Sequence, residues 1–324
     1  MNILIIGGAG FFGYSLAQFL SKKKMTIDIV DDFSRKTSTK DINFLKENKY
    51  INLIDKNLFD LYIDNEFGRN YKVIFHFAAI VGVDNVINNP YLTLSKNILL
   101  TDIAIKIAKA QKNLNKFIFT STSEVYSGAI ETGIASIPTS EKTELIIETS
   151  HTKRSTYKLS KITGESLCMN SGLPVTIFRP HNIYGPRMGM SHVIPELIKK
   201  ILLLNSDEKL EVFSINHTRT FCYIKDAIQL FFIAMHNNLT DNEILNMGTP
   251  APEIKIMELA ELLCKLSKKN LKIIACEPQE GSISRRCPDM SKTIKLTNYK
   301  PSIGLKEGLT DTFNWYKKNI RIYL

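Results

Sequence analysis

The sequence predicts an α/β fold, in which helices cover both faces of a parallel sheet and a smaller α/β lobe follows. Three observations predict it. Apolar strand-like segments alternate with helical patterns over the first 180 residues, and a glycine-rich turn joins the first strand to the first helix. The chain has 324 residues and is 44% hydrophobic, which is enough for a full core.

The expected strands are short and apolar, and β-branched residues are frequent in them. They cover residues 2–7, 26–31, 50–55, 72–79, 116–123 and 174–180. Helices are expected at about 11–23, 93–111 and 156–170, and a polar loop at about 127–153. Beyond Pro180 the pattern loosens, and we expect a strand at 210–213 and helices near 195–204, 225–236 and 256–268. We therefore assign residues 1–180 to a nucleotide-binding domain and residues 181–324 mainly to a substrate lobe, and leave open that the chain crosses back into the main sheet.

Three glycines stand between the first strand and the first helix. Gly7 permits a tight turn, Gly10 lets a pyrophosphate approach the backbone, and Gly13 lets the helix pack on the strand. Free N–H groups and the helix dipole then attract phosphates, as in a Rossmann-type doubly wound sheet. Asp31, at the end of the second strand, is expected to accept hydrogen bonds from ribose hydroxyls and to repel a 2′-phosphate. The pattern predicts NAD rather than NADP; a plain turn with a solvated aspartate is the alternative.

Tyr157 and Lys161 stand four residues apart and share a helix face. A neighbouring ammonium lowers the pKa of a phenol, so Tyr157 could take a proton from a hydroxyl while hydride leaves the same carbon. Thr122 follows a strand and could bond the same oxygen. The alternatives are a surface tyrosine–lysine pair, and a turn capped by Thr122 and Ser123.

These residues, taken in order, resemble the extended short-chain dehydrogenase/reductase family of NAD-dependent nucleotide-sugar epimerases and dehydratases. The resemblance covers nearly the whole chain, and its landmarks are "GGAGFFG", Asp31, "LID" ending at Asp55, "HFAA", Asn97, "STSEVY", "YKLSK", "FRPHNIYGPR", "RTFCYIKD" and "RRCPD". It implies a tightly held NAD, a sugar linked to a nucleoside diphosphate, and a catalytic triad of Thr122, Tyr157 and Lys161.

The resemblance also implies binding residues, position by position. For the cofactor they are Gly7, Gly10, Phe11, Phe12, Gly13, Asp31, Asp32, Asp55, Lys56, Phe77, Ala78, Ala79, Asn97 and Lys161. For the substrate they are Val81, Ser123, Asn182, Arg219 and Arg286, with the two arginines clamping the diphosphate. Arg286 could instead be a surface arginine beside Arg285. The family implies a homodimer formed through the helices at 94–112 and 156–170.

The reaction is harder to predict than the family. Glu124 resembles the glutamate of decarboxylases and dehydratases, whereas "AAIVGVDNVINNP" looks more like the epimerases. We expect an epimerase of an NDP-hexose or NDP-hexuronic acid that acts through a transient 4-keto sugar. An NDP-hexuronate decarboxylase and an NDP-sugar 4,6-dehydratase are the alternatives. A non-catalytic scaffold that binds a dinucleotide is a minor alternative, because all three residues of the triad are present.

Composition narrows the partners. The net charge is +10, but the lysines are spread out without a basic–aromatic stripe, so we expect an anionic small ligand and no nucleic acid. No apolar stretch approaches the length of a membrane span, and no signal peptide is expected. The five scattered cysteines suggest neither a metal site nor disulfides, which is typical of a cytoplasmic protein.

Overall fold

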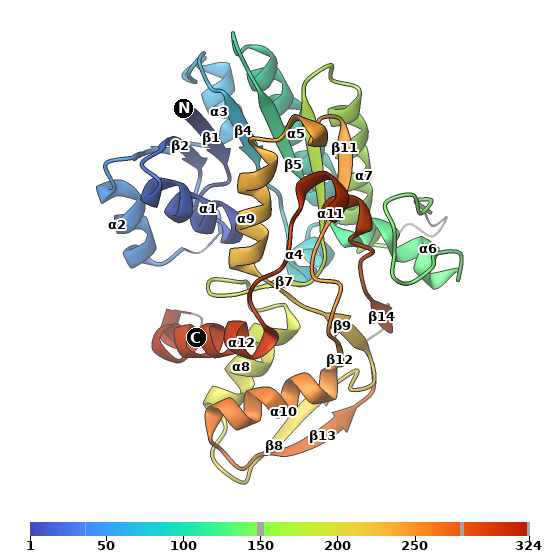
Figure 1. Ribbon diagram of the computed structural model, residues 1–324. Coiled ribbons are helices and arrows are strands. Elements are labelled where there is room, and N and C mark those ends of the chain that lie inside the picture. Colours follow the sequence, from blue (N-terminus) through green and yellow to red (C-terminus); the bar gives the residue numbers. More distant parts are fainter. Residues whose placement is uncertain (36, 148–151, 279–281, 323–324) are drawn as a thin grey trace.

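The computed structural model describes residues 1–35, 37–147, 152–278 and 282–322, and its centre is a parallel sheet of seven strands (Figure 1). The strand order is β11-β6-β5-β4-β1-β2-β3. The strands are β1 (Asn2–Ile6), β2 (Thr26–Asp31), β3 (Ile51–Asp55), β4 (Val73–His76), β5 (Lys116–Thr120), β6 (Val175–Pro180) and β11 (Glu243–Met247). The order reverses between β1 and β4, which is where ligands bind in doubly wound sheets. The predicted fold class is confirmed.

Alternate residues of β1 enter two different cores, as the two faces of a strand require. Ile3 and Ile5 pack in the core formed with α1 (Phe11–Lys22) and α9 (Ile224–Ala234), whereas Leu4 and Ile6 pack toward the helices on the other face. Those helices are α3 (Leu58–Ile63), α5 (Pro90–Lys109) and α7 (Ser155–Met169). None of the helices in the described ranges is long and apolar enough to span a membrane.

The C-terminal part of the chain contributes to two bodies. A lobe below the main sheet in Figure 1 holds three small sheets, β10-β7, β12-β9-β14 and β13-β8. Its strands are β7 (Ile183–Tyr184), β8 (Lys209–Phe213), β9 (Thr218–Thr220), β10 (Cys222–Tyr223), β12 (Glu253–Lys255), β13 (Lys272–Cys276) and β14 (Arg285–Arg286). Its helices are α8 (Val193–Leu203), α10 (Ile256–Ser267) and α12 (Leu305–Asn319). Between these elements the chain returns to the main sheet through α9, β11 and α11 (Ser291–Thr297).

Several elements differ from the sequence-based expectation. No strand was expected at 243–247, although β11 pairs with β6 along its whole length. The expected loop at 127–153 begins with α6 (Ser127–Glu131), which follows the short 3₁₀ helix η1 (Ser123–Tyr126); residues 148–151 of that stretch lie outside the described residues. The short helices α2 (Thr39–Glu47) and α4 (Val83–Asn88) were also missed. These elements are short or depend on distant partners, so local periodicity gives little sign of them.

A buried ion pair fixes α7 to the sheet. Arg179 of β6 donates to both carboxylate oxygens of Glu165, at 2.9 and 2.5 Å, and both side chains are at most 5% exposed. Arg179 also donates to the Tyr126 hydroxyl at 2.9 Å, which in turn donates to Asn246 of β11 at 2.9 Å. The helix, η1 and the last strand of the sheet are therefore joined by one buried polar network.

Replacing Glu165 with alanine should destabilise the protein strongly. Arg179 would keep its buried charge without a counterion, which typically costs about 3–5 kcal/mol. Urea unfolding of the purified protein measures the loss. The control is Asp102→Ala, which breaks the exposed pair with Lys106 on α5 and should cost at most about 0.5 kcal/mol. A Glu165→Ala loss no larger than the control's would contradict the structural role of the pair.

Candidate active site

The turn between β1 and α1 depends on its glycines. Gly7 has φ +80°, and a Cβ there would lie 2.6 Å from the backbone nitrogen of Ala78. A Cβ on Gly13 would lie 2.4 Å from the Gly7 carbonyl oxygen, so any larger residue would push the helix off the strand. At Gly10 the nearest atom would be 3.3 Å away, and no side chain caps α1 there. The first turn of α1 is thus open to a phosphate group, which fits the pyrophosphate of NAD.

Asp31 is held at the end of β2 beside this turn. Its carboxylate accepts hydrogen bonds from the backbone N–H groups of Ala9 and Phe33, both at 2.9 Å. Burial nevertheless raises its pKa, which the two N–H donors oppose. The carboxylate is therefore fixed next to the glycine turn, where the ribose of a dinucleotide would lie.

At the end of β3, the side chain of Lys56 is bound by protein carboxylates. Asp55 is the register partner of Asp31, but the ammonium group of Lys56 pairs with Glu66 at 2.5 Å and is also 3.6 Å from Asp64. The Lys56 side chain points to these carboxylates, so we expect its backbone rather than its side chain to line an adenine. Asp32 accepts a hydrogen bond from Asn57 at 3.0 Å.

The aromatic residues assigned to the cofactor lie partly in the core. The ring of Phe12 packs against Phe77 and Phe231, with centroids 5.9 and 5.6 Å apart. Phe11 contacts Phe12 at 5.3 Å. The Phe12 and Phe77 rings therefore pack in the core beneath the turn, and the predicted cofactor contacts of Phe11, Phe12, Phe77, Ala78 and Ala79 stay predictions.

The side-chain amide of Asn97 is hydrogen-bonded within the protein. Its Oδ1 accepts from the Ile80 N–H at 2.7 Å, and its Nδ2 donates to the Ile80 carbonyl at 3.2 Å and to Ser160 at 3.1 Å. The side chain is buried and its polar atoms bond within the protein. It therefore holds the loop after β4, which contains Val81, against α7.

The four predicted catalytic side chains come together at the carboxyl end of β5. The Lys161 ammonium donates to the Thr120 carbonyl at 2.8 Å and lies 6.0 Å from the Tyr157 ring centroid. Thr122 accepts from the Glu124 N–H at 3.2 Å, and its hydroxyl is within hydrogen-bonding reach of the Tyr157 phenol. Glu124 interacts electrostatically with the same phenol. The arrangement can bind a hydroxyl and move its proton.

The pKa values in this site are set mainly by burial. Burial lowers the pKa of Lys161 to about 8, with Cys168 and Glu165 acting in the opposite direction. Burial raises the pKa of Tyr157, and Glu124 raises it further, whereas the hydrogen bond with Thr122 lowers it. The sequence predicted a lowered phenol pKa, but in this state desolvation of the phenol outweighs its favourable neighbours.

Two arginines lie side by side on the substrate lobe. Arg219 of β9 and Arg286 of β14 are register partners in a parallel pair. Arg219 donates to the carbonyls of Thr218 and Ser284 at 2.8 and 3.0 Å and also to Ile283. Burial and the charge of Arg286 lower the pKa of Arg219 to about 9. Within the described part of the chain, the buried Nε of Arg286 has no hydrogen-bond partner. Two adjacent desolvated cations favour a bound anion such as a diphosphate.

The remaining substrate positions border this pair. Asn182 has φ +46° and donates to the Thr220 carbonyl at 3.0 Å, which ties it to β9. Arg286 also interacts electrostatically with Glu124, so the arginine pair and the catalytic residues face one site. Ser123 is buried in η1 next to Glu124.

Two residues of this region, His192 and Arg154, were not predicted from the sequence. His192 is exposed, yet desolvation lowers its pKa, and it interacts electrostatically with Arg35, Glu124 and Arg286. Arg154, just before α7, interacts in the same way with Arg286. Single arginines and histidines in irregular segments carry no sequence signal, and only the folded chain brings them here.

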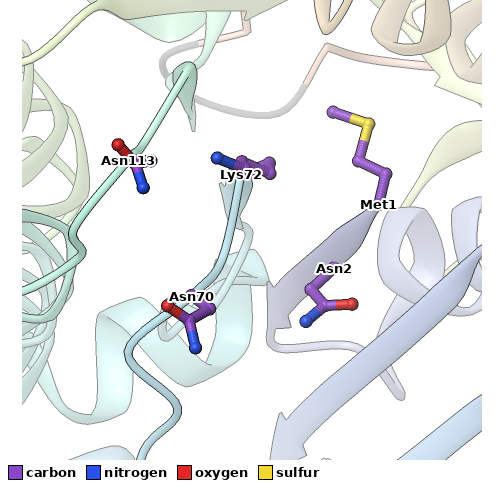
Figure 2. A pocket seen from close by; sticks show the side chains of 5 residues that line it. All are labelled: Met1, Asn2, Asn70, Lys72 and Asn113. Atoms are coloured by element: carbon purple, nitrogen blue, oxygen red, sulfur yellow. The ribbon is translucent and has the colours of Figure 1, made fainter.

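A hollow elsewhere on the molecule is not part of this site. Figure 2 shows its lining residues, Met1, Asn2, Asn70, Lys72 and Asn113, around a volume of about 340 Å³. Asn2 begins β1, and Lys72 and Asn113 precede β4 and β5. The hollow therefore lies at the amino ends of the strands, the sheet edge opposite the residues described above.

Comparisons with known proteins agree with this geometry. A family model described as "NAD dependent epimerase/dehydratase family" matches residues 3–248. The chain is 31% identical to the UDP-N-acetyl-alpha-D-glucosaminuronate decarboxylase of Bacillus cytotoxicus, with 97% of each chain covered. It is 29% identical to the UDP-glucuronic acid 4-epimerase from Bacillus cereus solved with UDP-glucuronic acid and NAD, with a TM-score of 0.84 and coverage of 98% and 100%. A UDP-glucose 4-epimerase from Thermotoga maritima, 23% identical over 99% of this chain and 100% of its own, shares the fold with a TM-score of 0.84.

Binding of NADP should be at least about tenfold weaker than binding of NAD. The fixed Asp31 carboxylate would face the 2′-phosphate, and the two charges repel each other. Calorimetry on protein stripped of bound cofactor measures both constants. The variant Asp31→Asn should reduce the difference between the affinities for NAD and NADP, because it removes the charge of the side chain but keeps its shape. Equal binding of the two cofactors by the wild type would contradict this role of Asp31.

Proposed function

Because the chain belongs to the NAD dependent epimerase/dehydratase family, we propose that it decarboxylates a UDP-linked hexuronic acid through a 4-keto sugar. The observation that carries the choice of reaction is the position of Glu124, which interacts with both Tyr157 and Arg286. Two relatives, a decarboxylase and a 4-epimerase, are both named for UDP-linked uronic acids, which supports this substrate class.

Oxidation at C4 is assigned to the triad. Bound NAD would accept the hydride from C4 and return it after decarboxylation. Thr122 and Tyr157 bind the C4 oxygen, and Tyr157 accepts its proton. Because burial raises the pKa of the phenol, the phenolate needs a cation nearby, and Lys161 supplies the ammonium. The only hydrogen bond of that ammonium to the described residues is to the Thr120 carbonyl, so its charge is available to the phenolate.

The second step is the decarboxylation, and it gives a role to the carboxylate of Glu124. Once C4 is a ketone, the carboxylate on C5 belongs to a β-keto acid. The electron pair of the bond between C5 and the carboxyl carbon then moves toward the ketone oxygen as carbon dioxide leaves, and C5 takes up a proton. We assign the transfer of this proton to Glu124, and its interaction with Arg286 supports a cation beside the substrate carboxylate. Because Glu124 raises the pKa of Tyr157, it works against the first step, and a role in the second would account for its presence.

The epimerase expected from the sequence is the second candidate. The similarity to the UDP-glucuronic acid 4-epimerase from Bacillus cereus supports it. An epimerase would turn the ketosugar and return hydride to the other face of C4, and no proton would be moved at carbon. Glu124 would then only pair with Arg286 or cap η1.

A homodimer is part of the proposal. The helices α5 and α7 pack against each other on one side of the sheet. Large apolar side chains remain exposed on α5, with Tyr91 79%, Leu92 41% and Leu99 43% exposed. A second copy of the chain would cover them, which supports the dimer that the sequence resemblance implies.

Replacing Tyr157 with phenylalanine should lower turnover by about 10²–10⁴-fold, the usual cost of losing a general acid–base group. The ring is kept, so NAD binding and the unfolding midpoint should stay near the wild-type values. Steady-state kinetics on a UDP-linked hexuronic acid measures the effect. The matched control is Tyr50→Phe, which removes a phenol hydroxyl just before β3, at the opposite edge of the sheet. Near-normal turnover of Tyr157→Phe would exclude the phenol as proton acceptor.

Replacing Glu124 with glutamine separates the two candidate reactions. A decarboxylase should lose at least about tenfold in turnover, since the glutamine amide cannot carry the proton. In deuterated water its remaining product should carry deuterium at C5. The control is Glu131→Gln, a carboxylate on α6 that also interacts with Arg286.

An epimerase should keep at least about a tenth of its activity in Glu124→Gln, because its proton transfers involve only the C4 oxygen. Its product should then carry no deuterium on the sugar carbons. That result would contradict the decarboxylase proposal.

A further inference from the structure

Arg35 reaches out of the cofactor domain to the substrate lobe. It stands four residues after Asp31, in the segment between β2 and α2. A Cβ built on Gly189 would lie 2.5 Å from an Arg35 terminal nitrogen, so the guanidinium rests directly on the Gly189 backbone. Gly189 belongs to residues 185–192, the segment that joins β7 to α8. The guanidinium is thus directed toward residues 185–192 of the substrate lobe.

The surroundings of this guanidinium are unusual for an arginine. In the described ranges, the only hydrogen bond of Arg35 uses its backbone carbonyl, which accepts from Thr37 at 3.1 Å, and no carboxylate pairs with its side chain. His192 lies on the same side of Gly189, since its Cδ2 would be 4.0 Å from the same Cβ, and it interacts electrostatically with Arg35, Arg286 and Glu124. A guanidinium that lies against a backbone segment without a protein counterion can donate to an anion that comes from outside the chain.

Other contacts place residues 185–192 across from the cofactor domain. A Cβ on Gly82, in the loop after β4, would lie 3.5 Å from the Ser191 hydroxyl. Arg187 pairs with Asp41 of α2 at 2.8 Å and lies 4.1 Å from the Tyr14 ring centroid. The segment is therefore fixed between the two bodies, and Arg35 lies on the cofactor-domain side of it.

We propose that Arg35 is a third arginine for a diphosphate, and that it donates to a phosphate oxygen held between the glycine turn and residues 185–192. Two ligands offer this chemistry, the pyrophosphate of the cofactor and the diphosphate of the nucleotide sugar. The substrate source rests on the proposed function, whereas the cofactor source does not.

The test measures both ligands with the variant Arg35→Gln. One calorimetric titration uses NAD with stripped protein, and the other uses UDP with NAD-loaded protein. We expect at least about a tenfold loss of affinity in one of them, as for the loss of a charge-assisted hydrogen bond. A loss for NAD identifies the pyrophosphate, and a loss for UDP identifies the substrate diphosphate. The control Arg69→Gln removes a charge before β4, at the opposite edge of the sheet, and should change neither constant.

A second variant tests the position of the side chain. In Gly189→Ala the new methyl group occupies the place of the guanidinium, which is the mobile end of its side chain, so the fold should tolerate the change. We expect Gly189→Ala to weaken the same ligand by at least about threefold and to cause no further loss in the Arg35→Gln background. Losses that add in the double variant would contradict the assigned position.

Affinities of Arg35→Gln within about twofold of the wild type for both ligands would overturn the proposal. A wild type that binds NAD but not UDP would instead contradict the proposed substrate. The NAD titration would then still decide the role of Arg35.

Discussion

All seven strands of the main sheet run parallel, so their carboxyl ends meet at one edge, and the chemistry of the protein has to be assembled there. The glycine turn follows β1, Asp31 ends β2, and Thr122 follows β5. A helix facing the same edge supplies Tyr157 and Lys161. Arg219 and Arg286 belong to β9 and β14, which form part of a small sheet in the other lobe. This lobe therefore has to be held in a fixed position relative to the main sheet.

The return of the chain to the sheet provides that positioning. Asn246 of β11 accepts a hydrogen bond from Tyr126 and donates to the carbonyls of Thr139 and Asp289 at 2.9 and 3.0 Å. Asp289 stands three residues after Arg286. The same network continues through Arg179 to Glu165 on the catalytic helix. The segment that follows Arg286 and the helix that carries Tyr157 and Lys161 are therefore connected by one set of buried hydrogen bonds.

The sequence predicted the parts of this molecule whose signals are local. The strand–glycine–helix turn, Asp31 and the four-residue spacing of Tyr157 and Lys161 identified the fold and the family, and both are confirmed. The sequence did not predict β11, or the positions of Arg35 and His192, because these depend on contacts between distant segments. Its assignment of Asn97 to the cofactor stays a prediction, and in the fold that amide holds the loop after β4. The direction of the Tyr157 pKa shift was also wrong, because burial is a property of the folded state.

The central claim is that the enzyme first oxidises C4 of the sugar and that Glu124 then directs the reaction toward loss of the substrate carboxylate. The most direct measurement is mass spectrometry and NMR of the product formed by the NAD-loaded wild type from a UDP-linked hexuronic acid. The account predicts a sugar nucleotide that is lighter by carbon dioxide and has no carboxylate on C5. A product of unchanged mass with an inverted C4 centre would contradict it and would identify an epimerase.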